Sequence, residues 1–286
     1  MTSATVPPRG RELTIAVVLL ANTVAVTSLL TGALMAGITI SGHLFGAWQS
    51  PDPLSQGLVG AAMLGTVPGL FAVNRAQRWE EARTLVLPTA VVLLGLLGVS
   101  LGNSGRLHLA RGGSLFLVLF SLGWIAVLGL LVLGTLACLG RQYLAARVPV
   151  QEPAVPLPGW SKPLLALLGA GWFGIGAGLL ADPGSWGGFV PWAADRPDAQ
   201  ALGVWALALG VGILGALAED DLTRTRPALF ALPGVAVTAG LVLAARADRV
   251  HWGSGPGRSL LGLLVGLLVA GAVGYRLLWQ HDRQAS

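Results

Sequence analysis

Two short motifs place an arginine and a histidine on either side of one apolar residue. They are Arg106-Leu-His108 and Arg249-Val-His251. A guanidinium and an imidazole held together suit an anionic head group or a quinone-like carbonyl. The alternative interpretation is that these side chains only reach lipid phosphates from helix ends. We take Arg106, His108, Arg249 and His251 as the candidate ligand-binding residues.

The densest acidic cluster is the run Glu219-Asp220-Asp221. Carboxylate oxygens are ligands for divalent cations. However, consecutive side chains on a helix point about 100° apart, so three adjacent carboxylates seldom converge on one ion. We therefore expect a solvated helix end whose acids pair with Arg224 and Arg226.

Three further patterns each lack a part that their chemistry needs. His43, His108 and His251 are all expected near one rim of the molecule, yet no HxxxH, HExxH or cysteine partner accompanies them, as a metal site would require. The run Gly102-Asn-Ser-Gly105 matches the GxSG of rhomboid-type serine proteases, but its serine lies beyond the expected helix and no HxxxN accompanies it. Cys138 is the only cysteine, which excludes a disulfide. The sequence therefore predicts no catalytic residue, no metal site and no cofactor.

The elements that must position these residues are membrane-spanning helices. The 286 residues include only 18 basic and 13 acidic side chains, 54% are apolar, and the mean hydropathy is +0.72. These values lie far from those of soluble domains. A spanning helix needs about 20 predominantly apolar residues. Eight segments qualify: 13–40, 58–73, 84–101, 114–139, 163–181, 201–218, 228–245 and 260–278. The predicted fold is an all-α polytopic membrane bundle.

Basic residues predict how this bundle is oriented, because cytoplasmic segments are enriched in arginine and lysine. With eight helices both termini lie on one side, and that side holds 12 of the 18 basic residues. We expect both termini in the cytoplasm and the candidate Arg/His residues at the outer face of the inner membrane. The basic residues are spread over short connecting segments rather than gathered in a patch, so no nucleic acid partner is expected.

All 13 acids are expected in connecting segments or at helix ends. A central intramembrane acid costs about 2.5 to 3.5 kcal/mol on insertion and normally serves a function. The expected absence of one disfavours a proton-coupled transporter with a carboxylate relay. It also disfavours an intramembrane aspartyl protease, which needs two paired acids.

Three residue types predict how the helices pack. Asn22, Thr23, Thr27, Ser28 and Thr31 make the first segment the most polar, so we expect it to face protein, and a substrate path along it is the less favoured interpretation. Tryptophans at helix ends are expected in the membrane interface; they are Trp48, Trp79, Trp160, Trp186, Trp192, Trp252 and Trp279. GxxxG pairs are expected to bring helix backbones close together; they are Gly65/Gly69, Gly98/Gly102, Gly174/Gly178 and Gly262/Gly266.

Matches between the two halves predict an internal duplication at a spacing of 143 to 144 residues. Trp48, Pro53 and Gln56 align with Trp192, Pro197 and Gln200, and Arg83, Arg106 and His108 align with Arg226, Arg249 and His251. Four helices in each unit imply parallel copies. The expected units are residues 1–147 and 159–286, joined by a proline-rich linker over 148–158.

Residues 189–252 contain five runs of note: Phe189-Val-Pro-Trp192, Gln200-Ala-Leu-Gly-Val-Trp205, Glu219-Asp-Asp221, Arg224-Thr-Arg-Pro227 and Arg246-Ala-Asp-Arg249 with Trp252. In these runs the second half resembles a family of bacterial multi-pass membrane proteins from high-GC genomes. That family has no established activity, so the resemblance implies a fold and no catalytic role.

The sequence leaves three classes of function open. The leading hypothesis is a non-enzymatic membrane protein that is a subunit of a membrane complex or binds a small amphipathic or anionic ligand at its outer face. The second is a facilitator or secondary transporter with a site between the two units. The third is a membrane enzyme that uses the rim histidines.

Overall fold

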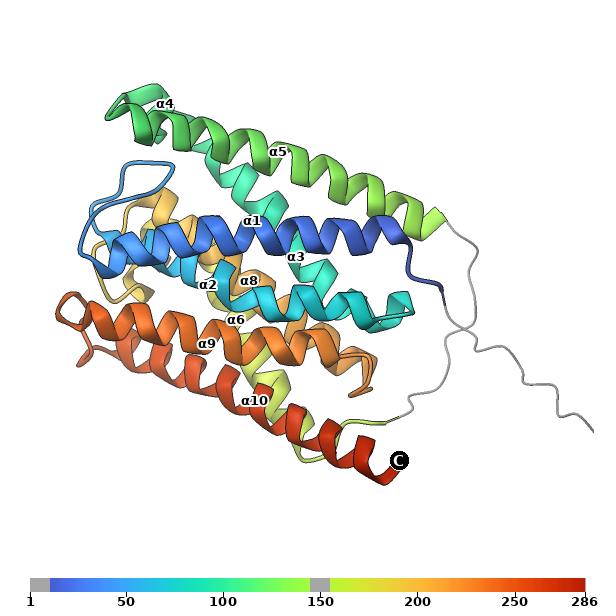
Figure 1. The fold of residues 1–286 in the computed structure, drawn as a ribbon. Helices are drawn as coiled ribbons and strands as arrows, with labels where there is room; N and C mark the ends of the chain where they lie inside the picture. The colour runs from blue at the N-terminus through green and yellow to red at the C-terminus, as the bar shows by residue number, and fades with distance from the viewer. Residues whose placement is uncertain (1–10, 145–154, 286) are drawn as a thin grey trace, which may run out of the picture.

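The computed structural model describes residues 11–144 and 155–285, and this part of the chain is built of helices without an extended strand. Each of the eight long helices is apolar enough to cross a membrane, so the chain has the architecture of a multi-pass membrane protein (Figure 1). They are α1 (Ile15–Ile40), α2 (Pro53–Ala72), α3 (Trp79–Gly102), α5 (Leu115–Leu144), α6 (Ser161–Ala181), α8 (Arg196–Glu219), α9 (Arg226–Ala245) and α10 (Gly255–Ala285). Two single turns, α4 (His108–Arg111) and α7 (Pro183–Trp186), lie in connecting segments.

The eight predicted helices are confirmed, but most of them extend beyond the predicted bounds into polar sequence. Capping explains two of the early starts. Asp52 precedes α2 and its side chain accepts a hydrogen bond from the amide of Leu54 at 2.9 Å. Asp195 precedes α8 and accepts from the amide of Asp198 at 3.3 Å. In both helices a proline follows within the first turn, where its missing N–H costs nothing.

The long helices form an inner and an outer set. Helices α2, α3, α8 and α9 are the most buried. In α2, 72% of the most apolar 18-residue stretch is buried inside the protein. Helices α1, α5, α6 and α10 lie outside them, and only 22% of the corresponding stretch of α10 is buried. Large apolar side chains such as Leu30, Leu130 and Leu167 are exposed on the outer set. A soluble protein rarely exposes so much apolar surface, whereas in a membrane protein such surface is covered by lipid.

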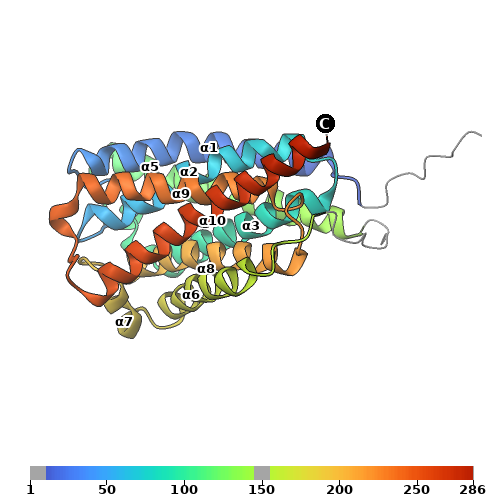
Figure 2. The ribbon, with the colours of Figure 1, turned by 90° about the horizontal axis from the view of Figure 1, so that it is seen from below.

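The bundle has two distinct ends. Figure 1 shows that α1 begins at the same end at which α10 finishes, and we call this the terminal end. The segment 41–52, α4 and the α9–α10 connection gather at the opposite end, and Figure 2 places α7 there too. Figure 2 also shows α1 and α6 on opposite sides of the bundle. The first seven residues of the expected linker, 148–154, lie outside the described residues, and the division into two units stays a prediction.

Glycines bring three pairs of helices into backbone contact. A Cβ on Gly32 of α1 would lie 2.6 Å from the carbonyl oxygen of Gly60 of α2, and one on Gly176 of α6 would lie 2.8 Å from that of Gly203 of α8. A Cβ on Gly234 of α9 would overlap the carbonyl oxygen of Gly65 of α2. Such approaches let helices pack in lipid, where no hydrophobic drive joins them.

The GxxxG prediction is right for one pair and wrong for most of the others. Gly65 and Gly69 both meet backbone atoms of α9. No atom lies within 4 Å of a Cβ built on Gly98, Gly102, Gly174 or Gly262. The physical reason is that close approach needs a small residue on each of two facing helices, and the spacing within one helix does not specify the partner.

We expect Gly234→Ala to destabilise the bundle, because the added methyl group meets the carbonyl of Gly65. Overpacking of this kind lowers the free energy of unfolding by about 1 to 3 kcal/mol. Gly240 lies on the same helix with no atom within 4 Å of its Cβ position, so Gly240→Ala should have little effect. Denaturation of both variants in one detergent measures the difference, and equal midpoints would contradict a close α2–α9 contact.

Candidate functional site

The two Arg/His motifs have matching positions at the opposite end of the bundle. Arg106 ends the 3-10 turn after α3, and Arg249 ends the one after α9. Each histidine then forms a backbone hydrogen bond to the segment that precedes the second long helix of its half. The amide of His108 donates to the carbonyl of Ala47 at 3.1 Å, and that of His251 donates to Pro191 at 2.9 Å.

The side chain of each of these four residues lies close to a polar partner. Arg106 Nη1 lies 3.8 Å from Asp195 Oδ2, and Arg249 Nε lies 3.4 Å from the neighbouring Asp248 Oδ2. His108 Nδ1 lies 3.3 Å from the carbonyl oxygen of Gly112, and His251 Nδ1 lies 2.9 Å from that of Pro191. Within the described chain no hydrogen bond or ion pair joins one motif to the other. Their role in ligand binding therefore stays a prediction.

Two tryptophans below this rim are buried in protein rather than placed in the lipid interface, so that prediction is wrong for them. Trp48 is 2% exposed, and its indole N–H donates to Asp198 Oδ1 at 2.9 Å. Trp192 donates in the reverse direction, to Ser55 Oγ at 2.9 Å. The Trp48 bond thus joins the segment before α2 to the first turn of α8. The Trp192 bond joins the segment before α8 to the first turn of α2.

Asp198 is a buried acid whose burial the sequence did not predict. Its position in the first turn of α8 agrees with the expectation that acids lie at helix ends, but the residue is 0% exposed. Ser50 Oγ and the indole of Trp48 both donate to its carboxylate. Among the described residues it forms no ion pair. The adjacent Asp-Arg-Pro-Asp sequence reads as a helix cap and gives no sign of this burial.

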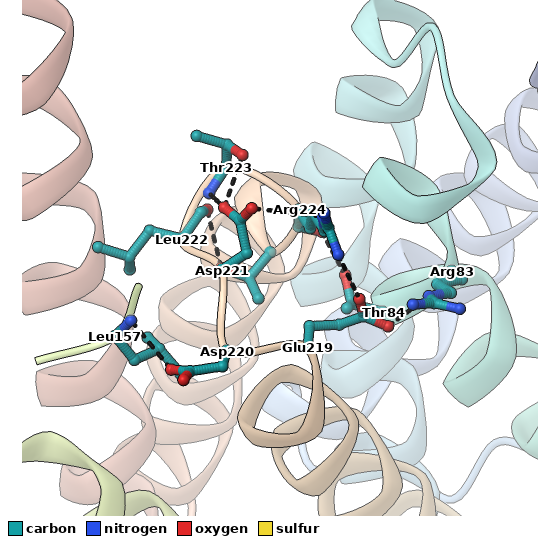
Figure 3. Close-up of polar contacts among 10 residues, drawn as sticks. Arg83, Thr84, Leu157, Glu219, Asp220, Asp221, Leu222, Thr223 and Arg224 are labelled. Atoms are coloured by element: carbon teal, nitrogen blue, oxygen red, sulfur yellow. Dashed lines mark hydrogen bonds and ion pairs between the residues drawn. The ribbon is translucent and has the colours of Figure 1, made fainter. Parts of the chain in front are cut away.

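The acidic run at the terminal end forms an ion-pair cluster (Figure 3). Glu219 is paired with Arg83 of α3, and its Oε2 lies 3.6 Å from Arg224 Nη1. Asp221 Oδ2 lies 3.3 Å from Arg224 Nε, and its other oxygen accepts from Thr223 at 2.7 Å. The expected pairing with Arg224 is confirmed.

Two details of that prediction are wrong. The cluster is not solvated, because Glu219 is only 10% exposed and Asp221 is buried. Arg226 pairs with Asp282 of α10, at 2.7 Å, instead of with the acidic run. Burial follows from Arg83, which reaches the cluster from the other half of the chain.

Asp220 points away from its two acidic neighbours. It ends α8 in the left-handed conformation, with a φ of 49°. Its carboxylate accepts from Lys162 Nζ at 2.6 Å and from the amide of Leu157 at 3.1 Å. The hydrogen bond from Lys162 lowers the pKa of Asp220 below its usual value. Glu219 and Asp221 thus share Arg224, whereas Asp220 has separate partners, so the three carboxylates do not converge on a common point.

The bundle contains a cavity of about 640 Å³. All eight long helices contribute to its lining, and among the described residues no charged side chain or histidine does. It reaches the exposed apolar side chains Leu164 of α6, Val265 and Val269 of α10, and Val127 of α5. The four candidate Arg/His residues are not among its lining residues. Sequence patterns did not predict this cavity.

The chain is without detectable relatives in these comparisons: no protein-family model, curated protein or solved structure matches it. The site is therefore interpreted from its own geometry. The resemblance described for residues 189–252 stays a prediction.

We expect Glu219→Gln to destabilise the protein strongly. Glutamine keeps the shape of the side chain but removes the charge that balances Arg83 and Arg224, and breaking a buried ion pair costs about 3 kcal/mol or more. Asp282→Asn is the matched control, because the pair with Arg226 is half exposed and such pairs contribute about 0 to 1 kcal/mol. Denaturation midpoints compare the two, and an equal loss in both would contradict the buried cluster.

We expect Asp198→Leu to lower stability by about 1 to 3 kcal/mol, because it leaves the indole N–H of Trp48 buried without an acceptor. Asp198→Asn retains an acceptor oxygen and should keep most of the stability. Ser55→Ala, which removes the acceptor of Trp192, should act in the same direction as Asp198→Leu. The same denaturation assay measures all three, and indistinguishable leucine and asparagine variants would show that the indole contact contributes nothing.

Proposed function

We propose that this chain is a non-enzymatic membrane protein that binds an apolar or amphipathic ligand within its helix bundle. The observation that carries the proposal is the internal cavity. Ligand sites in proteins typically enclose about 300 to 1,000 Å³ and are lined mainly by apolar side chains with a few polar groups. The cavity of about 640 Å³ meets this description.

The position of the openings supports a ligand that arrives through the lipid. Leu164, Val265 and Val269 line the cavity and are exposed on the side of the bundle that carries apolar surface. A molecule dissolved in the bilayer would reach the cavity between α6 and α10 without crossing a polar surface. The ligand-binding part of the leading hypothesis thus moves from the outer rim to the interior of the bundle. A role as a subunit of a membrane complex is compatible with it.

We also propose that the bundle arose by parallel duplication, with both termini in the cytoplasm of a bacterial cell. The reciprocal contacts support the duplication. Gly32 packs on Gly60 as Gly176 packs on Gly203, and these positions are 144 and 143 residues apart. The two histidine amides and the two crossed indole bonds repeat in the same way. The 12 basic residues assigned to the terminal end support the orientation.

A facilitator or secondary transporter is the second candidate, and the reciprocal packing of the halves favours it. The contact between α2 and α9 speaks against a water-filled path there. Gly65 meets Gly234 at the level of the backbone, and Thr238 donates to the carbonyl of Ala61 at 2.6 Å. A charge-free cavity also suits an apolar ligand better than an ion.

We expect Gly123→Leu to weaken binding of an apolar ligand at least about tenfold, because the new side chain occupies space that the ligand needs. Gly123 lines the cavity on α5, and no atom lies within 4 Å of its Cβ position. Gly129 lies on the same helix with equally open surroundings but does not line the cavity, so Gly129→Leu is the matched control.

Native mass spectrometry of the protein, released from detergent after incubation with decylbenzene, measures the bound fraction. Retention of decylbenzene by the wild type and by Gly129→Leu, with loss in Gly123→Leu, is the expected result. Equal retention by both variants would overturn the cavity as the binding site.

A further inference from the structure

Hydroxyl groups are the main polar groups of the cavity, and they fall into two kinds. Eight serine and threonine side chains line it. Five of them donate to backbone carbonyls within the chain: Thr66, Thr84, Thr89, Ser161 and Thr225. The remaining three, Thr27, Ser28 and Thr31, form no side-chain hydrogen bond with any described residue.

These three hydroxyls belong to one face near the middle of α1. Positions 27 and 31 are one turn apart, as are 28 and 31, so their side chains cluster. Ser28 is only 6% exposed. A hydroxyl in an apolar helix normally donates to a carbonyl of the preceding turn, as Thr23 of the same helix does to Leu19 at 2.9 Å. An unpaired hydroxyl donor that faces an apolar cavity is costly, which points to a partner that the chain does not supply.

We propose that Thr27, Ser28 and Thr31 donate hydrogen bonds to an uncharged oxygen atom of a lipid-soluble ligand whose apolar part fills the rest of the cavity. This inference rests on the ligand-binding role proposed above and names the ligand's chemical class. The ligand is a hydrophobic molecule with a carbonyl or hydroxyl oxygen near one end or in a ring.

The lining excludes the other classes of lipid at this position. A phosphate or carboxylate head group needs a cation or several strong donors when it leaves water, and no arginine, lysine or histidine lines the cavity in the described part of the chain. An ammonium group would likewise need a carboxylate, and none is present in the lining. A pure hydrocarbon would leave the three hydroxyls unpaired. An uncharged carbonyl or hydroxyl oxygen accepts up to two hydrogen bonds from this cluster at a small desolvation cost.

A pair of probes isolates the contribution of these donors. Decylbenzoquinone offers carbonyl oxygens that only accept hydrogen bonds, and decylbenzene has the same tail and a ring without oxygen. Native mass spectrometry after titration gives the apparent affinity of each probe. We expect the wild type to bind decylbenzoquinone at least about tenfold more tightly than decylbenzene, as two or three ordinary hydrogen bonds allow.

The triple variant Thr27→Val, Ser28→Ala, Thr31→Val removes the hydroxyls with little change of shape. It should bind both probes with similar affinity, close to that of decylbenzene in the wild type. The double variant Thr66→Val, Thr89→Val is the matched control. Its two hydroxyls line the same cavity but already donate within the chain, so it should keep the preference for the quinone.

The outcomes separate this inference from the proposed function. If the wild type binds both probes equally, or if the triple variant keeps the preference, the hydroxyl site is wrong while the cavity remains a binding site. If the wild type binds neither probe, the proposed function fails and the inference fails with it. Size-exclusion profiles and thermal midpoints of the variants establish that any lost preference does not come from unfolding.

Discussion

A buried hydrogen-bond donor in a membrane-spanning bundle has no water to bind, so it must find its partner within the protein or in a ligand. The described chain follows this constraint along most of its length. Thr89 and Thr135 donate to carbonyls of their own helices, and Thr238 reaches across to α2. The ion pairs lie at the two ends of the bundle, and at the terminal end Glu219 has two arginine partners. Against this background, the hydroxyls of Thr27, Ser28 and Thr31 stand out, because they line the cavity and form no side-chain hydrogen bond with any described residue.

The same apolar surroundings also explain why the bundle contains a cavity. Helices in lipid associate through close contact and hydrogen bonds rather than through the hydrophobic effect, and glycine provides the closest contacts. Helix α2 has such contacts on two sides, with α1 through Gly60 and with α9 through Gly65. Glycines of α5 behave differently, since Gly123, Gly129 and Gly140 meet no atom within 4 Å. A helix without these contacts stays at the periphery, and the space beside it becomes part of the cavity.

The helices could be predicted because a spanning segment needs a long apolar run, and that requirement is visible in one dimension. Their ends could not, because a cap depends on local geometry. The first turn of α3 holds Glu80 and Glu81, and the first turn of α8 holds Asp198. The predicted helices began later, at residues 84 and 201, and left these acids outside. Trp48 illustrates the same limit. An indole near a helix end is usual at a membrane interface, and only the packing of the second half places an acceptor beside it.

The candidate site was partly within reach of the sequence. The polar residues of α1 led to the expectation that this helix faces protein, but only 33% of its most apolar stretch is buried. Thr23 and Ser28 look alike in sequence and differ only in their contacts. Arg106 and His108 were predicted to bind a ligand because charged side chains can bind polar groups in water. In an uncharged cavity, affinity comes mainly from burial of apolar surface, at about 25 cal/mol per Å². Each hydroxyl adds only about 0.5 to 1.5 kcal/mol, so its effect is to choose among ligands of similar size and to fix their orientation. A site of this kind is recognised by polar groups that line a cavity and have no hydrogen-bond partner in the described chain.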